Sequence, residues 1–236
     1  MNGVDLLILA VIGVSVLFGL YKGFIHSVFG LFGIFLAVLI AYFAYPQLAK
    51  SLQGNDSLVR NLIHYSDASL RVRDLDLSQT PVAGIPEQAL NEIMDRTGLP
   101  KPIDDFVRAN IVGQVFASLG SASVSEYLNQ TVITVSLNIL CFLLCFGIAY
   151  AAVMLLSHML GYVFRMPVLK HFDVLLGGLF GGVRGALLVM ILFAVVPVLL
   201  TVSPIEELTK AIDESQLASV FYHTNMIQLV MQGTLF

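Results

Sequence analysis

Four long apolar runs dominate the pattern of hydrophobic and polar positions along the chain. A helix that crosses a bilayer needs about 20 apolar residues, and the runs that reach or approach this length cover residues 6–20, 24–45, 131–164 and 174–202. The first run is the shortest, so we expect a short or tilted span. Because Asp5 precedes it and Lys22 follows it, we expect an uncleaved anchor, since a secretory signal carries its positive charge first.

The segment between the second and third runs has a different character. Residues 46–130 hold 7 basic and 10 acidic residues, which are 17 of the 28 charged residues of the chain, and five of its eight prolines. This composition predicts an insert outside the membrane, beginning where Pro46 closes the second run. Pro86 is typical of a first helical turn and Gly98 of a helix end, and a second helix should begin near Ile103.

Capping patterns indicate where two further helices begin. Ser123 and Glu126 fit a capping box, in which each side chain accepts the backbone N–H of the other residue. The helix that starts there would be about 40 residues long, which exceeds the thickness of the bilayer core. Ser203 and Glu206 fit a second capping box, which opens a tail over residues 203–236. This tail is either an amphipathic helix at the membrane interface or an ordinary packed helix.

The composition agrees with these patterns. Hydrophobic residues make up 57% and charged residues 12% of the chain, and the mean hydropathy is +0.86, whereas soluble domains average about 45–50% apolar and about 25% charged residues. The net charge of −4 gives no electrostatic support to nucleic-acid binding. We predict an all-α, polytopic membrane protein with about four transmembrane helices, divided into a hairpin over 1–45, a helical extracytoplasmic insert over 46–130, a second hairpin over 131–202 and a tail over 203–236.

The orientation follows from the two short connections. Lys22 lies between the first two runs, and Arg165 and Lys170 lie between the last two. Short loops rich in lysine and arginine stay in the cytoplasm. The insert, the tail and both termini would then lie outside.

Five glycines form a small-residue face on the fourth helix. Small residues at intervals of four let two helix backbones approach closely. The face is either a packing surface, within the bundle or between subunits, or the lining of a gating or pore helix. Its members are Gly177, Gly178, Gly181, Gly182 and Gly185.

Arg184 lies beside this face, about 15 Å into the fourth helix at 1.5 Å per residue. An arginine near the membrane centre costs at least a few kcal/mol on insertion scales, so something must compensate its charge. The side chain could reach the inner headgroups, pair with His158 or Tyr150, or line a wet cavity. Arg184 is therefore either a functional residue or a structural anchor.

The third helix carries a face of polar and small residues, spaced by three or four positions. We expect this face to pack against the glycines of the fourth helix, with the lining of a water path as the alternative. The two cysteines are interpreted as packing residues, and His158 as a hydrogen-bonded structural residue. The face includes Thr131, Thr134, Asn138, Cys141 and Cys145.

Common catalytic and nucleotide-binding motifs are missing from the sequence. It contains no G-x-S-x-G, no Walker glycine–lysine pair, no H-E-x-x-H and no C-x-x-C. The paired acids of the insert lack the glycine and glutamate positions of an EF-hand. We therefore expect no enzymatic activity, no cofactor and no metal site.

Two segments resemble the colicin V production (CvpA) family of bacterial inner-membrane proteins. They are Asp5-Leu6-Leu7-Ile8 with Tyr21-Lys22-Gly23-Phe24, and the glycine-rich run from Phe172 to Gly185. The resemblance covers both hairpins and implies a link to toxin (bacteriocin) production or export and to envelope maintenance. It supplies no catalytic residue or cofactor, and by analogy it favours Asp173, Gly177, Gly181, Arg184 and Gly185.

Two functions are consistent with these features. The first is a non-enzymatic membrane factor that is embedded in lipid and acts through other envelope or secretion proteins, with the insert and the tail as docking surfaces outside the membrane. The alternative is a channel or small transporter that uses Arg184 and the glycine-rich helix. Four helices with so few polar groups cannot readily enclose a pore, so the alternative requires a homo-oligomer.

Overall fold

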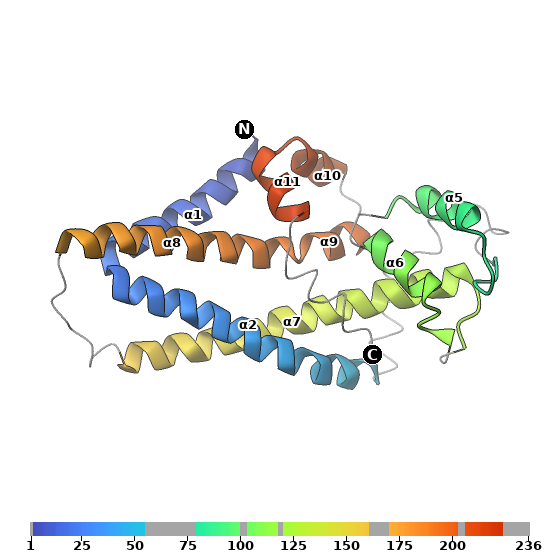
Figure 1. The fold of residues 1–236 in the computed structure, drawn as a ribbon, viewed down its shortest axis with the longest axis horizontal. Helices are drawn as coiled ribbons and strands as arrows, with labels where there is room; N and C mark the ends of the chain where they lie inside the picture. Colours follow the sequence, from blue (N-terminus) through green and yellow to red (C-terminus); the bar gives the residue numbers. More distant parts are fainter. Residues whose placement is uncertain are drawn as a thin grey trace. The chain divides into compact units, whose positions relative to one another are not determined.

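The computed structural model describes residues 2–54, 79–99, 103–117, 120–160, 170–202 and 206–223, coloured along the chain in Figure 1. Within these ranges the regular structure is entirely helical, apart from one isolated β-bridge. The all-α class is therefore confirmed. Arg165 and Ser203, the first residue of the second capping box, lie outside the described residues.

Four helices are long and apolar enough to cross a membrane, which confirms a multi-pass membrane protein. The first candidate span has 20 residues and is the shortest of the four. Its length of about 30 Å, at 1.5 Å per residue, is still enough to cross the bilayer core. The helices that contain the candidate spans are α1 (Gly3–Lys22), α2 (Phe24–Gln53), α7 (Val124–Leu160) and α8 (Lys170–Phe193), and the last span extends into α9 (Val196–Val202).

Two prolines affect these helices differently. The expected end of the second helix at Pro46 is wrong, because α2 continues through this proline to Gln53. A proline inside a helix removes one backbone hydrogen bond, a loss that membrane helices tolerate when neighbouring groups compensate it. Pro197 instead follows a break, since α8 ends at Phe193 and α9 begins at Val196. Its nitrogen cannot donate to the carbonyl four residues earlier, so the helix restarts with proline in its first turn.

The chain divides into two compact units, and each has its own interior. The first comprises the described parts of residues 1–47, 141–194 and 206–227, and the second those of 48–140 and 195–205. In the first unit, α1 and α8 lie side by side (Figure 1). Two short helices, α10 (Glu206–Asp213) and α11 (Gln216–His223), complete this unit.

The tail helices pack against α1. The side-chain nitrogen of Asn2 donates to the carbonyl of Ala211, and Ser215 donates its hydroxyl hydrogen to the carboxylate of Asp5. Ile212 of α10 is buried. The burial of Tyr222, together with the charge of Asp213, raises the pKa of the Tyr222 phenol to about 12. The described tail helices therefore pack against α1, and their position at the membrane interface stays a prediction.

In the second unit, the two predicted insert helices are present as α5 (Glu87–Thr97) and α6 (Ile103–Val112). Pro86 is the N-cap of α5, and Gly98 ends the helix with a left-handed φ of 58°. The capping box of α7 is confirmed, because the amide of Ser123 donates to Glu126 over 3.1 Å and the amide of Glu126 donates to the hydroxyl of Ser123 over 3.4 Å.

A short backbone bridge brings the two ends of this helical segment together. Pro81 pairs with Ser123 in an antiparallel bridge. The amide of Val82 donates to Ala122 over 2.9 Å, and the amide of Val124 donates to Thr80 over 3.0 Å. The backbone at residues 80–82 therefore lies beside the backbone at residues 122–124, immediately before α7.

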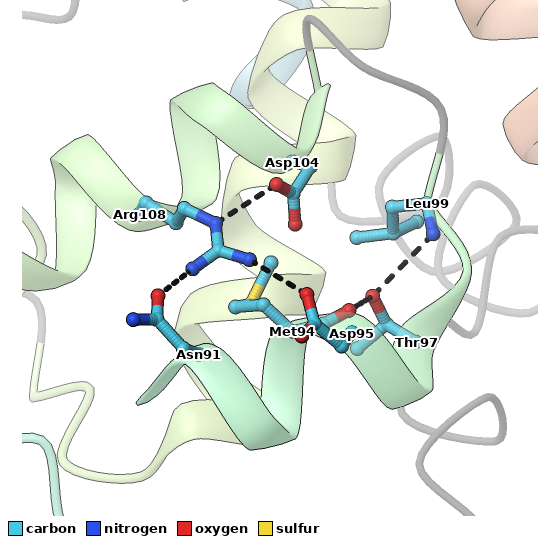
Figure 2. A network of polar contacts seen from close by, with 7 residues as sticks. All are labelled: Asn91, Met94, Asp95, Thr97, Leu99, Asp104 and Arg108. Atoms are coloured by element: carbon cyan, nitrogen blue, oxygen red, sulfur yellow. Dashed lines mark hydrogen bonds and ion pairs between the residues drawn. The ribbon is translucent and has the colours of Figure 1, made fainter. Parts of the chain in front are cut away.

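Arg108 links α5 to α6 (Figure 2). Its Nε donates to Asp104 on the same helix over 2.8 Å, and its terminal nitrogens reach Asn91 and Asp95 on α5. Only 26% of its side chain is exposed, and its contact with Asp104 is partly buried, whereas its contacts with Asn91 and Asp95 are exposed. One side chain thus joins two helices that share few other polar contacts among the residues described.

We predict that Arg108→Ala loosens the contact between α5 and α6, because three acceptors lose their donor together. Loss of hydrogen bonds to a charged group costs about 1.5–3 kcal/mol, and we expect faster amide hydrogen exchange in both helices. The matched control is Arg96→Ala, which removes an exposed ion pair with Glu92 within α5 and should change stability by less than about 0.5 kcal/mol. Equal exchange in the two variants would contradict a linking role for Arg108.

Candidate functional site

The closest approach between helices in the first unit joins α1 to α8. A Cβ atom placed on Gly181 would lie 2.5 Å from the carbonyl oxygen of Ser15, and one on Gly185 would lie 2.9 Å from the Cα of Ile12. A Cβ on Gly177 would collide with the backbone of Gly19. These neighbours are backbone atoms, which cannot move aside as a flexible side chain can. Only glycine therefore fits these positions.

The other two glycines of the face also meet α1, through its side chains. A Cβ on Gly178 would lie 2.6 Å from the Cδ2 of Leu20, and one on Gly182 would lie 3.4 Å from a methyl group of Val16. Both rows of the small-residue face thus lie against the first helix of the chain. The structure places them in helix packing within one chain.

The expected contact between the third helix and these glycines is wrong, because α1 occupies the face. The Thr131 hydroxyl of α7 instead accepts a hydrogen bond from the side-chain nitrogen of Asn110 on α6, over 3.0 Å in a buried setting. Asn138 is buried in the same unit as these two residues. Cys141 is buried, Cys145 is half-buried, and neither forms a disulfide.

The sequence contains a signal for the correct partner. On α1 and at its end, Ser15, Gly19 and Gly23 recur at intervals of four, which is the same small-residue spacing as on α8. All three lie close to the glycine positions of α8. A search for a second series of small residues would therefore have included α1 among the candidate partners.

Asp173, in the first turn of α8, contacts the start of α2 and so connects the two hairpins. Its carboxylate accepts the backbone N–H of Phe24, the first residue of α2, over 2.9 Å. Gly23, the residue before α2, has a left-handed φ of 84° and no side chain that could cap this helix. A Cβ on Gly23 would also collide with the Asp173 carboxylate. Asp173 thus satisfies a helix N-terminus that its own segment leaves open.

Arg184 extends from α8 toward α1 and α2. Its Cζ lies 5.1 Å from the centre of the Phe18 ring, a cation–π distance. A Cβ on Gly30 of α2 would lie 3.0 Å from its Nη1. The Nε is buried without a hydrogen-bond partner. The guanidinium therefore rests against an aromatic ring and a glycine.

The other predicted residues are distributed along the helices. Lys22 is exposed at the end of α1, His158 belongs to α7, and Lys170 begins α8. Asp5, which the sequence marks only as an early charge, caps α1 in a box with Asn2. Its carboxylate also accepts the backbone N–H of Leu217 over 3.2 Å, at the start of α11. The pattern Asn2-x-x-Asp5 was the available signal for this cap.

This geometry shows helix packing, capping and an arginine against an aromatic ring. Within the described residues no group of three or more His, Cys, Asp or Glu could hold a metal ion. The family model for the colicin V production protein matches residues 4–72 and 107–226. The chain belongs to the colicin V production family. The resemblance of the glycine-rich segment is thereby confirmed, and family membership supports a role in toxin production. No curated protein and no solved structure matches the chain.

The family match contains the close approach between α1 and α8, with both of its partners. It also contains Asp173 and Arg184, whereas residues 73–106, which include α5, fall between the two matched ranges. The family match thus covers all four candidate spans, together with the flanking parts of the insert and most of the tail.

We predict that Gly181→Ala destabilises the first unit, because the added methyl group meets the backbone of Ser15. Overpacking of this kind costs about 1–3 kcal/mol and should lower the temperature of thermal unfolding in detergent. Gly147→Ala is the matched control, since a Cβ there would meet nothing within 4 Å among the residues described. If both variants unfold at the same temperature, the close approach does not limit stability.

Asp173→Ala should weaken the start of α2, because the amide of Phe24 loses its acceptor. Removal of an N-cap acceptor costs about 1 kcal/mol, and we expect faster hydrogen exchange in the first turn of α2. Asp173→Asn keeps an oxygen acceptor and should exchange at nearly the rate of the original protein. If the asparagine variant is as labile as the alanine variant, the negative charge is required and capping alone does not explain the residue.

Proposed function

We propose that this chain is a non-enzymatic membrane factor that supports toxin production or export and envelope maintenance through partner proteins. The observation that carries the proposal is the family match over both hairpins. The interior of these hairpins consists of close helix packing and capping contacts, which suit a scaffold. Activity would then depend on what the exposed parts bind.

The insert is the proposed docking surface. Its bridge between residues 80–82 and 122–124 holds the segment at one point of the chain. Glu87 on α5 and Asp105 on α6 are both exposed. Exposed charges at an interface increase the rate of association and select the partner. The position of α5 outside the family match supports a partner that is particular to this chain.

We further propose a bacterial cytoplasmic membrane as the location, with both termini, the insert and the tail outside. The hydrogen bond between Asp173 and Phe24 supports this topology, because it brings the starts of α2 and α8 to one end of the first unit. Lys22 and Lys170 belong to the two short connections next to these helix starts. Both basic connections would therefore face the cytoplasm.

The test is complementation in bacteria that produce colicin V and lack their own family member. Expression of this chain should restore toxin release, measured as growth inhibition of a sensitive strain. Glu87→Lys combined with Asp105→Lys should reduce the restored release at equal membrane abundance, because the charge of the proposed docking surface is reversed.

The matched control for this experiment is Glu87→Asp combined with Asp105→Glu, which preserves both charges. Full release from the charge-reversed variant would exclude the insert as the docking surface. Failure of the original chain to restore any release, despite correct insertion, would contradict the role in toxin production itself.

The alternative function is an oligomeric channel or small transporter. Its support is Arg184, because an intramembrane charge commonly marks a solute path. The glycines that such a path would use lie against α1 of the same chain, so they support packing instead. Solute flux in proteoliposomes that Arg184→Ala abolishes would favour the channel over the scaffold.

A further inference from the structure

Two cations lie against one aromatic ring at an end of the first unit. The Nζ of Lys22 is 5.7 Å from the centre of the Phe18 ring, and the Cζ of Arg184 is 5.1 Å from the same centre. The two side chains come from α1 and α8, which are far apart in the sequence. Like charges repel when they are brought together, so this arrangement favours an anion near Phe18.

Neither cation has an acidic partner in the part of the chain that the structure describes. The ion pairs of Arg96 and Arg108 lie in the insert. In the first unit, the Asp173 carboxylate accepts the amide of Phe24, and the Asp5 carboxylate accepts groups from Ser215 and Leu217. Neither Lys22 nor Arg184 forms an ion pair with these acids, so both cations can bind an anion from outside the described residues.

The Arg184 guanidinium lies much nearer the membrane surface than its own Cα atom. Arg184 is 11 residues beyond Asp173, which places its Cα about 16 Å along α8. Helical side chains incline toward the N-terminus of their helix, and this one reaches Phe18. That ring is four residues before Lys22, or about 6 Å from the end of α1. The guanidinium also lies beside Gly30, six residues or about 9 Å beyond the start of α2. The side chain thus reaches from the depth of its Cα atom back toward the headgroup side of the bilayer.

The surroundings leave space for this position and provide an apolar surface beside it. Gly30 faces Nη1, and a larger residue there would occupy the space of the guanidinium. On α1, Leu17 and Phe18 are exposed, and 85% of Tyr21 is exposed. A free inorganic ion would gain nothing from these apolar side chains, whereas the acyl chains of a lipid would cover them.

We propose that Lys22 and Arg184 together bind the phosphate group of an anionic phospholipid in the leaflet next to the turn at Gly23. The terminal nitrogens of Arg184 donate to the phosphate oxygens, and Lys22 adds a second positive charge. Arg184 is half-buried, and its buried Nε takes no part in the binding. Phe18 holds both cations at one place, and Gly30 keeps the arginine accessible.

The experiment uses the full chain purified in a neutral detergent and titrated with phosphatidylglycerol, with bound lipid counted by native mass spectrometry. Lys22→Gln should weaken binding about fivefold, as expected for one basic residue near an anionic surface. Arg184→Gln should weaken it at least about tenfold, because charge-assisted hydrogen bonds are lost as well. The matched control is Lys210→Gln, which removes an exposed lysine of α10 and should leave binding unchanged.

Three results would overturn the proposal. The first is equal affinity for phosphatidylglycerol in the original protein and in Lys22→Gln, a variant at an exposed helix end that tests the site even if Arg184→Gln does not fold. The second is equal binding of phosphatidylcholine, which would remove the requirement for an anionic lipid. The third is displacement of the lipid by inorganic phosphate at comparable concentration, which would identify the ligand as a free anion.

Discussion

The first unit depends on the close contact of two backbones between α1 and α8. Within lipid there is no hydrophobic force that drives two apolar helices together, so van der Waals contact over a smooth surface must supply the attraction. The glycines of α8 provide that surface, and Ser15 and Gly19 complete it on α1. The contact has a cost, because the hydroxyl of Ser15 is buried without a hydrogen-bond partner. The Asp173 cap and the position of Arg184 both follow from this pairing.

The polar residues of the first unit have separate tasks. Asp173 closes a helix start that a glycine leaves open, and Asp5 does the same for two helices at the opposite end of α1. Arg184 remains charged beside an aromatic ring, without an acid of its own. Each acid has thus become part of the scaffold, while the arginine keeps donors for something outside the chain. These roles are consistent with a scaffold in the membrane and with recognition of partner proteins by the insert.

The sequence predicted the spans and the insert helices well, because apolar run length, proline, glycine and capping residues act locally. It also indicated Arg184, since a charge inside an apolar run is costly in any arrangement. It did not predict which helix meets the glycine face, because several helices carry small residues and pairing is a tertiary property. The end of α2 was misplaced because a buried helix can continue through Pro46. The cap of α1 by Asp5 had a local signal in Asn2-x-x-Asp5, whereas its contact with Ser215, 210 residues away, had none.

The shared carboxylate of Asp5 has a consequence for biosynthesis. The first helix leaves the ribosome long before its partners exist, because α8 begins at Lys170 and the contact with α11 requires Ser215 and Leu217. Proteins are synthesised from the N-terminus at about 5–20 residues per second, so α1 waits in the bilayer for many seconds with an unmatched glycine surface and an incompletely bonded acid. Its final docking can take place only after Ser215 and Leu217 have been synthesised. Quality control of the nascent chain therefore acts on a helix whose correct partner has not yet been made.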